Sequence, residues 1–257
     1  MENSFAIDEH VAPDRTLMGP GPSDIHPRVY SALSEQIVGY LDDSYVDVMN
    51  DVQAGLRYLF RTDNEYTFAV SGTGSAAMET AFANLLEPGE TVLVPTNGYF
   101  GKRMGEVAER AGAEVATVDG EWGEPLDPAA VEAAFERHQP TVFGFVHGET
   151  STGVRQTRIP ELTRIAREHG AYVIVDTVAS LGGAEFHTDE WGLDVVYSGS
   201  QKCLSAPPGA SPITFSDRAV EKIRSREEPV RSWYLDLEGV WEYWDDDPSY
   251  HHTGPIS

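Results

Sequence analysis

Short apolar runs that alternate with helix-like segments limit the fold of this chain more than any other feature. The runs occupy residues 66–70, 91–95, 114–118, 141–146, 171–176, 194–198 and 211–216. They lack a regular alternation of apolar and polar side chains, which is typical of strands covered on both faces. Strands separated by helices need crossover connections. The sequence therefore predicts an α/β fold in which helices sandwich a mostly parallel sheet.

The helix boundaries carry signals of their own. Asp127 precedes Pro128 at the start of one predicted helix, and Pro160 lies in the first turn of another. Proline is favoured at these positions because the first helical N–H groups have no intrahelical acceptor. A third helix is expected from Gly101 to Ala111. No linker rich in proline and glycine divides the chain before residue 225, so we expect a single domain up to that point.

Charge and composition exclude several classes of partner. Acidic residues outnumber basic residues by 42 to 18, which gives a formal net charge of −24. A chain this acidic is not expected to bind nucleic acid or an anionic membrane surface. One cysteine, no signal peptide pattern and no apolar run long enough to span a bilayer indicate a cytoplasmic protein. The acidity, with only three lysines, favours a protein adapted to high salt, and an ordinary acidic cytosolic protein is the alternative.

A glycine-rich turn, residues 71–75 (SGTGS), lies between a predicted strand and a predicted helix. Its backbone N–H groups and the helix N-terminus can bind a phosphate, and Thr73 and Ser75 add hydroxyls. The turn also fits the dinucleotide pattern G-x-G-x-x-A through Gly72, Gly74 and Ala77. That pattern needs an acidic residue after the next strand, which here ends VPTNG. A nicotinamide-dependent oxidoreductase is therefore only an alternative.

Asp176 and Lys202 complete a second and more specific pattern. Asp176 ends the clearest buried strand, where parallel sheets bind ligands, although it could instead cap a helix. Lys202 lies among small residues, and lysine, unlike arginine, can lose its proton and form a Schiff base. A phosphate loop, an acid for a ring nitrogen and a lysine, in this order, are what pyridoxal phosphate requires.

Six segments make the sequence resemble class V aminotransferases of fold type I, of the alanine–glyoxylate and serine–pyruvate kind. They are LMGPGPSDIHPRV, VSGTGSAAMETAFANLLEPG, HGETSTGV, VDTVASLGG, DVVYSGSQKCLSAPPG and YHHTGPIS. The resemblance runs from about Leu17 to Ser257 and keeps the order of the family. It implies pyridoxal phosphate as the cofactor and no metal.

The resemblance also implies roles for individual residues. Thr73, Gly74, Ser75 and Gln201 match positions at the cofactor's phosphate. Phe100 matches an aromatic residue, often tryptophan, that stacks on the ring, and Thr150 matches a hydroxyl near the phenolic oxygen. Asp176 and Lys202 match the partner of the ring nitrogen and the Schiff-base lysine, and both are expected to be catalytic. Gly21 matches a backbone position beside the substrate. Tyr250 and Thr253 match residues that reach the phosphate in the neighbouring subunit, which implies a homodimer with shared active sites.

The family pattern divides the chain into three parts. Residues 1–20 match an N-terminal arm, 21–240 the large cofactor-binding domain, and 241–257 the start of a connection to a small C-terminal domain. That small domain, which carries the arginine expected to bind the substrate carboxylate, has no counterpart here. We expect the chain to be a fragment of a longer protein.

The predicted function is transfer of an amino group between a small amino acid, alanine or serine, and a 2-oxo acid, glyoxylate or pyruvate. A catalytically silent module that binds the cofactor or dimerises is the alternative from another class. His147 and Glu149 could act as acid or base, but loop residues of this kind are more often structural. Cys203 is expected to be small and buried. The aromatic residues of 233–250 could form a dimer surface or cover the local core.

Overall fold

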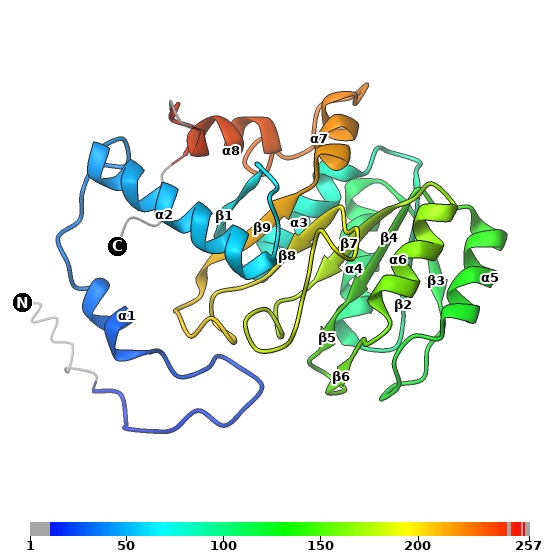
Figure 1. Cartoon of the computed structure of the whole chain (residues 1–257), viewed down its shortest axis with the longest axis horizontal. Coiled ribbons are helices and arrows are strands. Elements are labelled where there is room, and N and C mark those ends of the chain that lie inside the picture. The colour runs from blue at the N-terminus through cyan, green and yellow to red at the C-terminus, as the bar shows by residue number, and fades with distance from the viewer. Residues whose placement is uncertain (1–10, 246–247, 253, 255–257) are drawn as a thin grey trace, which may run out of the picture.

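A seven-stranded sheet forms the centre of the computed structural model, which describes residues 11–245, 248–252 and 254 (Figure 1). The strand order is β1-β9-β8-β7-β4-β2-β3. The bounds are β1 Thr67–Gly72, β2 Thr91–Pro95, β3 Glu114–Val118, β4 Val142–Val146, β7 Tyr172–Asp176, β8 Val195–Tyr197 and β9 Gly209–Phe215. Only β9 runs antiparallel to its neighbours in this sheet, β1 and β8. The prediction of a mostly parallel sheet is confirmed, and each predicted apolar run overlaps one strand.

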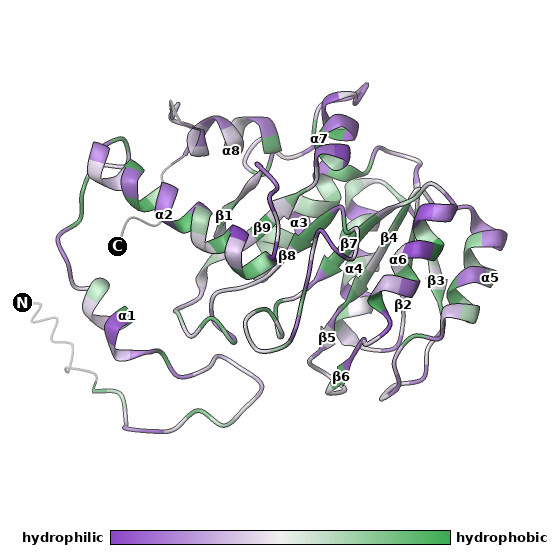
Figure 2. Ribbon diagram, viewed as in Figure 1, coloured by the Kyte–Doolittle hydropathy of each residue, from purple (hydrophilic) through white to green (hydrophobic). Residues whose placement is uncertain are grey.

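Helices cover both faces of the sheet, as predicted. Strand β4 shows why its residues are apolar throughout: Val142 and Val146 belong to one buried cluster, and Phe143 and Phe145 belong to the other. Neighbouring side chains of a strand point to opposite faces, so a sheet buried on both faces needs apolar residues in succession. Figure 2 shows these strands as a hydrophobic band inside more polar helices.

The two clusters assign the helices to layers. Side chains of α3 (Gly74–Leu85), α4 (Tyr99–Ala111), α7 (Asp217–Arg224) and α8 (Leu237–Trp244) belong to one cluster. Those of α2 (Asp43–Phe60), α5 (Pro128–His138) and α6 (Ile159–Glu168) belong to the other. The Asp127 side chain accepts a hydrogen bond from Ala129 N at the start of α5, as its position before Pro128 predicts. Helix α2 was not among the predicted elements.

Two smaller elements complete the chain. Helix α1 (Pro27–Ala32) follows an extended N-terminal segment, and a two-stranded hairpin joins β5 (Gly148–Glu149) to β6 (Val154–Arg155). Figure 1 shows α1 and the segment before it beside the body of the molecule rather than within its layers. Within the described residues, no helix combines the length and the apolar character needed to cross a membrane.

Candidate active site

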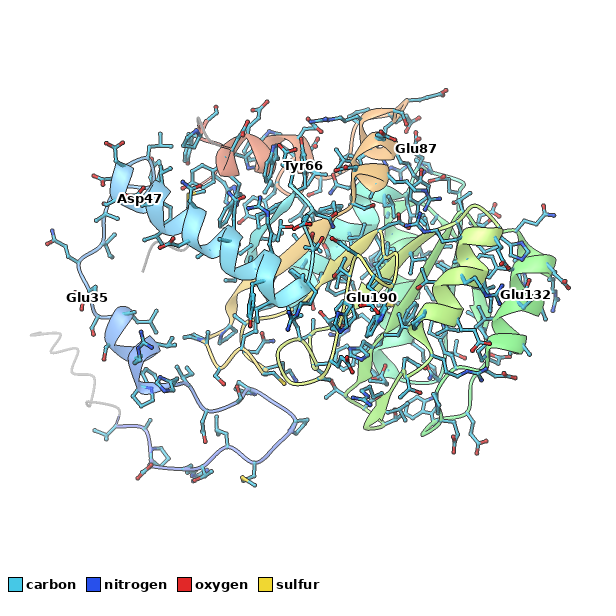
Figure 3. All side chains as sticks on the ribbon, viewed as in Figure 1. Glu35, Asp47, Tyr66, Glu87, Glu132 and Glu190 are labelled. Carbon is cyan, nitrogen blue, oxygen red and sulfur yellow. The ribbon has the colours of Figure 1, made fainter. Side chains whose placement is uncertain are left out.

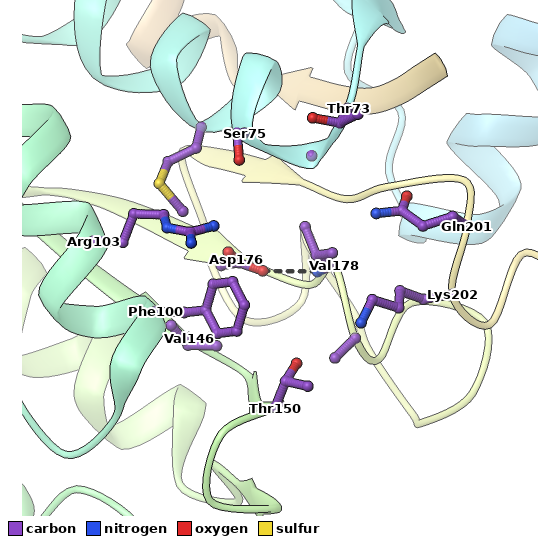
Figure 4. A pocket seen from close by; sticks show the side chains of 14 residues that line it. Thr73, Ser75, Phe100, Arg103, Val146, Thr150, Asp176, Val178, Gln201 and Lys202 are labelled. Atoms are coloured by element: carbon purple, nitrogen blue, oxygen red, sulfur yellow. Dashed lines mark hydrogen bonds between the residues drawn. The ribbon is translucent and has the colours of Figure 1, made fainter. Parts of the chain in front are cut away.

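A cavity of about 200 Å³ opens at the carboxyl edge of the sheet (Figure 4). Eight of the residues singled out in the sequence line it: Thr73, Gly74, Ser75, Phe100, Thr150, Asp176, Gln201 and Lys202. Strands β1 and β7 are separated by β9 and β8 but run in the same direction, because β9 is antiparallel to both β1 and β8 and β8 is parallel to β7. Both strands therefore end at this edge of the sheet. The sheet topology therefore brings together residues that lie more than a hundred positions apart.

The glycine-rich turn forms one wall of the cavity. Strand β1 ends at Gly72, whose φ of 146° favours glycine, and α3 begins at Gly74. A Cβ atom at Gly74 would lie 2.8 Å from Val178 Cγ2, so only glycine allows the helix start to approach the loop after β7 this closely. The exposed Thr73 forms no side-chain cap bond with α3. The helix therefore presents N–H groups and hydroxyls at the cavity, a combination suited to an anion.

Asp176 lies at the bottom of the cavity and is only 3% exposed. Its Oδ1 accepts a hydrogen bond of 2.8 Å from Val178 N, and it forms no ion pair within the described residues. Burial raises its pKa from 3.8 to about 6, and the charge of Glu149 adds to this, whereas the Val178 N–H, the Tyr197 hydroxyl and Arg103 lower it. The Tyr197 hydroxyl is buried near this carboxylate without forming a hydrogen bond of ordinary geometry. A cation placed beside Asp176 would favour its ionised form.

Lys202 lies in the loop that follows β8 and is half-buried. Its Nζ donates a hydrogen bond of 2.5 Å to the Pro20 carbonyl oxygen. A Cβ atom at Gly21 would lie 2.5 Å from the same Nζ, which explains why glycine is needed here. Ser23 holds the segment in place, because its N–H donates to Gln201 O at 2.9 Å. The Gly21 backbone therefore lies against the lysine, and its expected place beside the substrate stays a prediction.

Phe100 and Thr150 approach the cavity from two different elements. Phe100 lies in the first turn of α4, and Thr150 lies in the turn between β5 and β6. In Figure 4 the Phe100 ring lies between Asp176 and Thr150, and the Lys202 amine points toward the same space. Gln201 lies on the side of the cavity nearest Thr73, and its Oε1 is buried without a hydrogen-bond partner. An unpaired buried polar atom in a cavity wall is a feature of sites that bind a polar ligand.

Several residues depart from the sequence expectations or were missed by them. Cys203 is exposed rather than buried, because the turn after Lys202 points it outward, and its Sγ lies 3.4 Å from Ala179 O. Arg103 lines the cavity but was not predicted, since it looks like one charged residue among others on α4. Its spacing of three residues from Phe100 is the signal that would have found it.

His147 and Glu149 are both buried and bonded within the protein. His147 Nδ1 lies 2.9 Å from Ser180 Oγ, and burial lowers its pKa to about 4. Glu149 binds backbone N–H groups at the start of α4. The structural interpretation of these two residues therefore fits their contacts.

Of the two C-terminal positions in the predicted site, the structure describes Tyr250, which does not line the cavity. Tyr250 is half exposed, and its ring packs on that of Tyr40 with 5.0 Å between centroids. Thr253 lies outside the described residues. Their predicted contact with a second subunit stays a prediction.

Known proteins resemble this chain in sequence and in fold. The family model "Aminotransferase class-V" matches residues 28–230. An alanine–glyoxylate aminotransferase of Drosophila melanogaster is 43% identical over 94% of this chain and 62% of its own length. An (S)-ureidoglycine–glyoxylate transaminase of Bacillus subtilis is 36% identical over 95% of this chain and 63% of its own length. The crystal structure of an alanine–glyoxylate aminotransferase from Nostoc superimposes with a TM-score of 0.96, at 45% identity, over 98% of this chain and 67% of that one. The chain spans about three fifths of the length of the two curated relatives.

Proposed function

The chain belongs to the class V aminotransferase family, and from this premise we propose that it acts as a pyridoxal phosphate-dependent aminotransferase. The observation that carries the proposal is the meeting of the glycine-rich turn, Asp176 and Lys202 in one cavity. A nicotinamide-dependent oxidoreductase would explain the turn but would leave the lysine and the buried acid without a role.

The residues of the cavity fit pyridoxal phosphate. Thr73, Gly74 and Ser75 would hold the phosphate with N–H groups and hydroxyls, and Gln201, whose side-chain amide could donate to it, lies on the same side. Asp176 has no cationic partner within the described residues and would pair with a protonated ring nitrogen. Phe100 would lie against the ring, with Thr150 near the phenolic oxygen.

The chain's own groups would then control where protons lie. When bound, pyridoxal phosphate supplies an electron sink for the pair released at the substrate Cα. Asp176, ionised beside a cationic ring nitrogen, would keep that nitrogen protonated. The Lys202 Nζ, free as an amine, would remove the proton from Cα and return it at a neighbouring carbon. The Gly21 backbone would border the space for the substrate.

We propose glyoxylate as the amino acceptor and alanine as the donor, with pyruvate and serine as the other expected pair. The names of both curated relatives include glyoxylate, and the donor differs between them.

We also propose that two copies of the chain form a homodimer with shared active sites. Large apolar side chains are exposed near the N-terminus, among them Tyr30, Ile37 and Val48. The aromatic residues of 233–250 were expected either to form a dimer surface or to cover the local core. Trp241 and Tyr243 are buried in the chain's own core, whereas Trp233 is 71% exposed. Trp233, Tyr234 and Tyr250 are exposed and could contact a second copy.

Borohydride reduction and a turnover assay test the proposed function together. With pyridoxal phosphate added, borohydride is expected to fix the cofactor covalently on Lys202 of the wild-type chain, which mass spectrometry detects. The wild-type chain is also expected to produce pyruvate from alanine and glyoxylate. Lys202→Ala should lose both, whereas Lys102→Ala, an exposed lysine on α4, should keep both. Mass at Lys202 without turnover, either in this chain or in one joined to the small domain of a relative, would support the catalytically silent alternative. Attachment at another residue would overturn the assignment of Lys202.

A further inference from the structure

A buried carboxylate, Glu149, connects two walls of the cavity. Its side chain is 2% exposed, and its neighbours in sequence, Gly148 and Thr150, both line the cavity. Glu149 itself does not line it. Its contacts lead instead to α4, the helix that carries Phe100.

The two carboxylate oxygens of Glu149 bind different parts of the chain. Oε2 accepts hydrogen bonds from Phe100 N at 3.1 Å and Gly101 N at 3.3 Å, at the start of α4. Oε1 accepts from Ser151 N at 3.1 Å and Ser151 Oγ at 2.6 Å. The Ser151 hydroxyl in turn accepts from Tyr99 N at 2.9 Å. Glu149 therefore joins the first turn of α4 to the turn that carries Thr150.

The start of α4 is built around this carboxylate. Its N-cap residue is Gly98, which has no side chain to cap the helix, and a Cβ atom there would lie 2.2 Å from Glu149 Cγ. The capping oxygens therefore come from a different strand. Hydrogen bonds between a carboxylate and helix N-terminal N–H groups are strong because the charge and the helix dipole act together.

We propose that Glu149 is a positioning residue for the cofactor, because it fixes the Phe100 ring at a set distance from Thr150. This inference rests on the proposed function, since it concerns the space that the pyridoxal ring would occupy. Both oxygens of Glu149 are bound within the protein and its side chain does not line the cavity, so we assign it no role as an acid or base.

Electrostatics and positioning predict opposite effects when the Glu149 charge is removed. The negative charge of Glu149 raises the pKa of Asp176, so its loss would help Asp176 to ionise. It would also reduce repulsion of an anionic cofactor. Charge alone thus predicts unchanged or tighter binding in Glu149→Gln. Positioning predicts weaker binding, because one atom of an amide cannot accept from the N–H groups that Glu149 now binds.

Titration of the whole chain with pyridoxal phosphate separates these outcomes. We expect Glu149→Gln to raise the Kd about tenfold and to reduce the visible circular dichroism of the bound cofactor. The matched control is Asp127→Asn, which removes another helix-capping carboxylate that does not line the cavity and should keep the Kd within about twofold. A Kd for Glu149→Gln equal to or below that of the wild type would overturn the proposal.

A double variant tests whether Glu149 acts through Phe100. In a Phe100→Leu background, Glu149→Gln should weaken binding by less than about twofold, since the ring it positions is gone. A full tenfold loss in that background would show another route and contradict the proposal. If Glu149→Gln does not fold, Ser151→Ala removes the hydroxyl between Glu149 and Tyr99 N and should raise the Kd about threefold, whereas an unchanged Kd would refute the role. Failure of the wild type to bind pyridoxal phosphate would instead count against the proposed function.

Discussion

Two buried aspartates at opposite ends of the sheet have opposite surroundings. Asp194 immediately precedes β8, and its carboxylate binds Arg218 Nη1 at 3.0 Å, Arg167 Nη2 at 3.3 Å and Val173 N at 2.8 Å. Asp176 ends β7, forms no ion pair among the residues that the structure describes, and accepts its hydrogen bond from the Val178 N–H. Both are almost fully buried, at 0% and 3% exposure. Burial alone therefore does not separate a structural carboxylate from a binding one, and the supply of partners does.

The difference follows from what each end of the sheet must do. At the Asp194 end, Arg218 also packs on the Tyr172 ring, with 3.8 Å from its guanidinium carbon to the ring centre, and closes α7 onto the sheet. At the Asp176 end, the same layers separate and leave a cavity. An unpaired buried carboxylate lowers stability unless a ligand pairs with it. Asp176 is thus suited to binding and Asp194 to folding.

The largest effect that this comparison predicts is the loss of stability in Asp194→Asn. The variant leaves two partly buried guanidinium groups without their carboxylate, which should lower the free energy of unfolding by about 3–5 kcal/mol. Urea unfolding followed by tryptophan fluorescence measures this. Asp217→Asn, an exposed aspartate in the first turn of α7, is the control and should lose less than about 1 kcal/mol. An equally small loss in Asp194→Asn would remove the contrast between the two ends.

The same substitution at Asp176 should act in the opposite direction and depend on pH. The pKa of this buried carboxyl is raised from 3.8 to about 6, so the folded chain without cofactor binds more protons than the unfolded chain. Stability is retained below pH 3.8 and falls as the pH rises through 6, by about 3 kcal/mol in total. Asp176→Asn lacks this loss. The measurement is the free energy of unfolding of wild type and variant, without cofactor, at pH 4 and pH 7.5. Between these pH values the variant should gain stability relative to the wild type by close to that amount. A difference independent of pH would mean that Asp176 is not held neutral by burial.

The sequence predicted the Asp176 end better than the Asp194 end, for a physical reason. Asp176, Lys202 and the turn containing Gly74 each follow a strand, and parallel strands bring their carboxyl ends to one edge. Pairing of Asp194 with Arg167 and Arg218 depends on how helices pack, which no local pattern contains. The antiparallel direction of β9 was not predicted for a similar reason, because an apolar run does not indicate which way its strand lies in the sheet. The same limit applies also to α2, whose apolar residues include the exposed Val52.

Salt should change the stability that depends on surface charges more than the stability that depends on the buried ion pairs of Asp194. Acidic residues such as Glu35, Asp47 and Glu190 lie exposed in different parts of the chain (Figure 3), within a net charge of −24. Raising salt from about 0.1 M to 1 M shortens the screening length from about 10 Å to 3 Å, which should stabilise the wild type by weakening repulsion. The stability gap between wild type and Asp194→Asn should change by less than about 1 kcal/mol, because a buried pair is screened little. A wild type destabilised by salt would contradict the expected adaptation to high salt.

The smallest predicted effect concerns Phe100, on the wall of the cavity that α4 forms. Phe100 is half-buried, and its ring has open space beside it in the cavity. A larger aromatic ring at this position offers more stacking area, so Phe100→Trp should tighten binding of pyridoxal phosphate by about 0.5–1 kcal/mol, or two- to fivefold. Arg103, whose guanidinium carbon lies 4.9 Å from the Phe100 ring centre, can stack on the indole in the same way. The measurement is the Kd from absorbance titration, with Tyr99→Trp as the control, because Tyr99 does not line the cavity. Weaker binding in Phe100→Trp alone would mean that the space between Phe100 and Thr150 is already matched to phenylalanine, which would support a tightly set width at this end of the sheet.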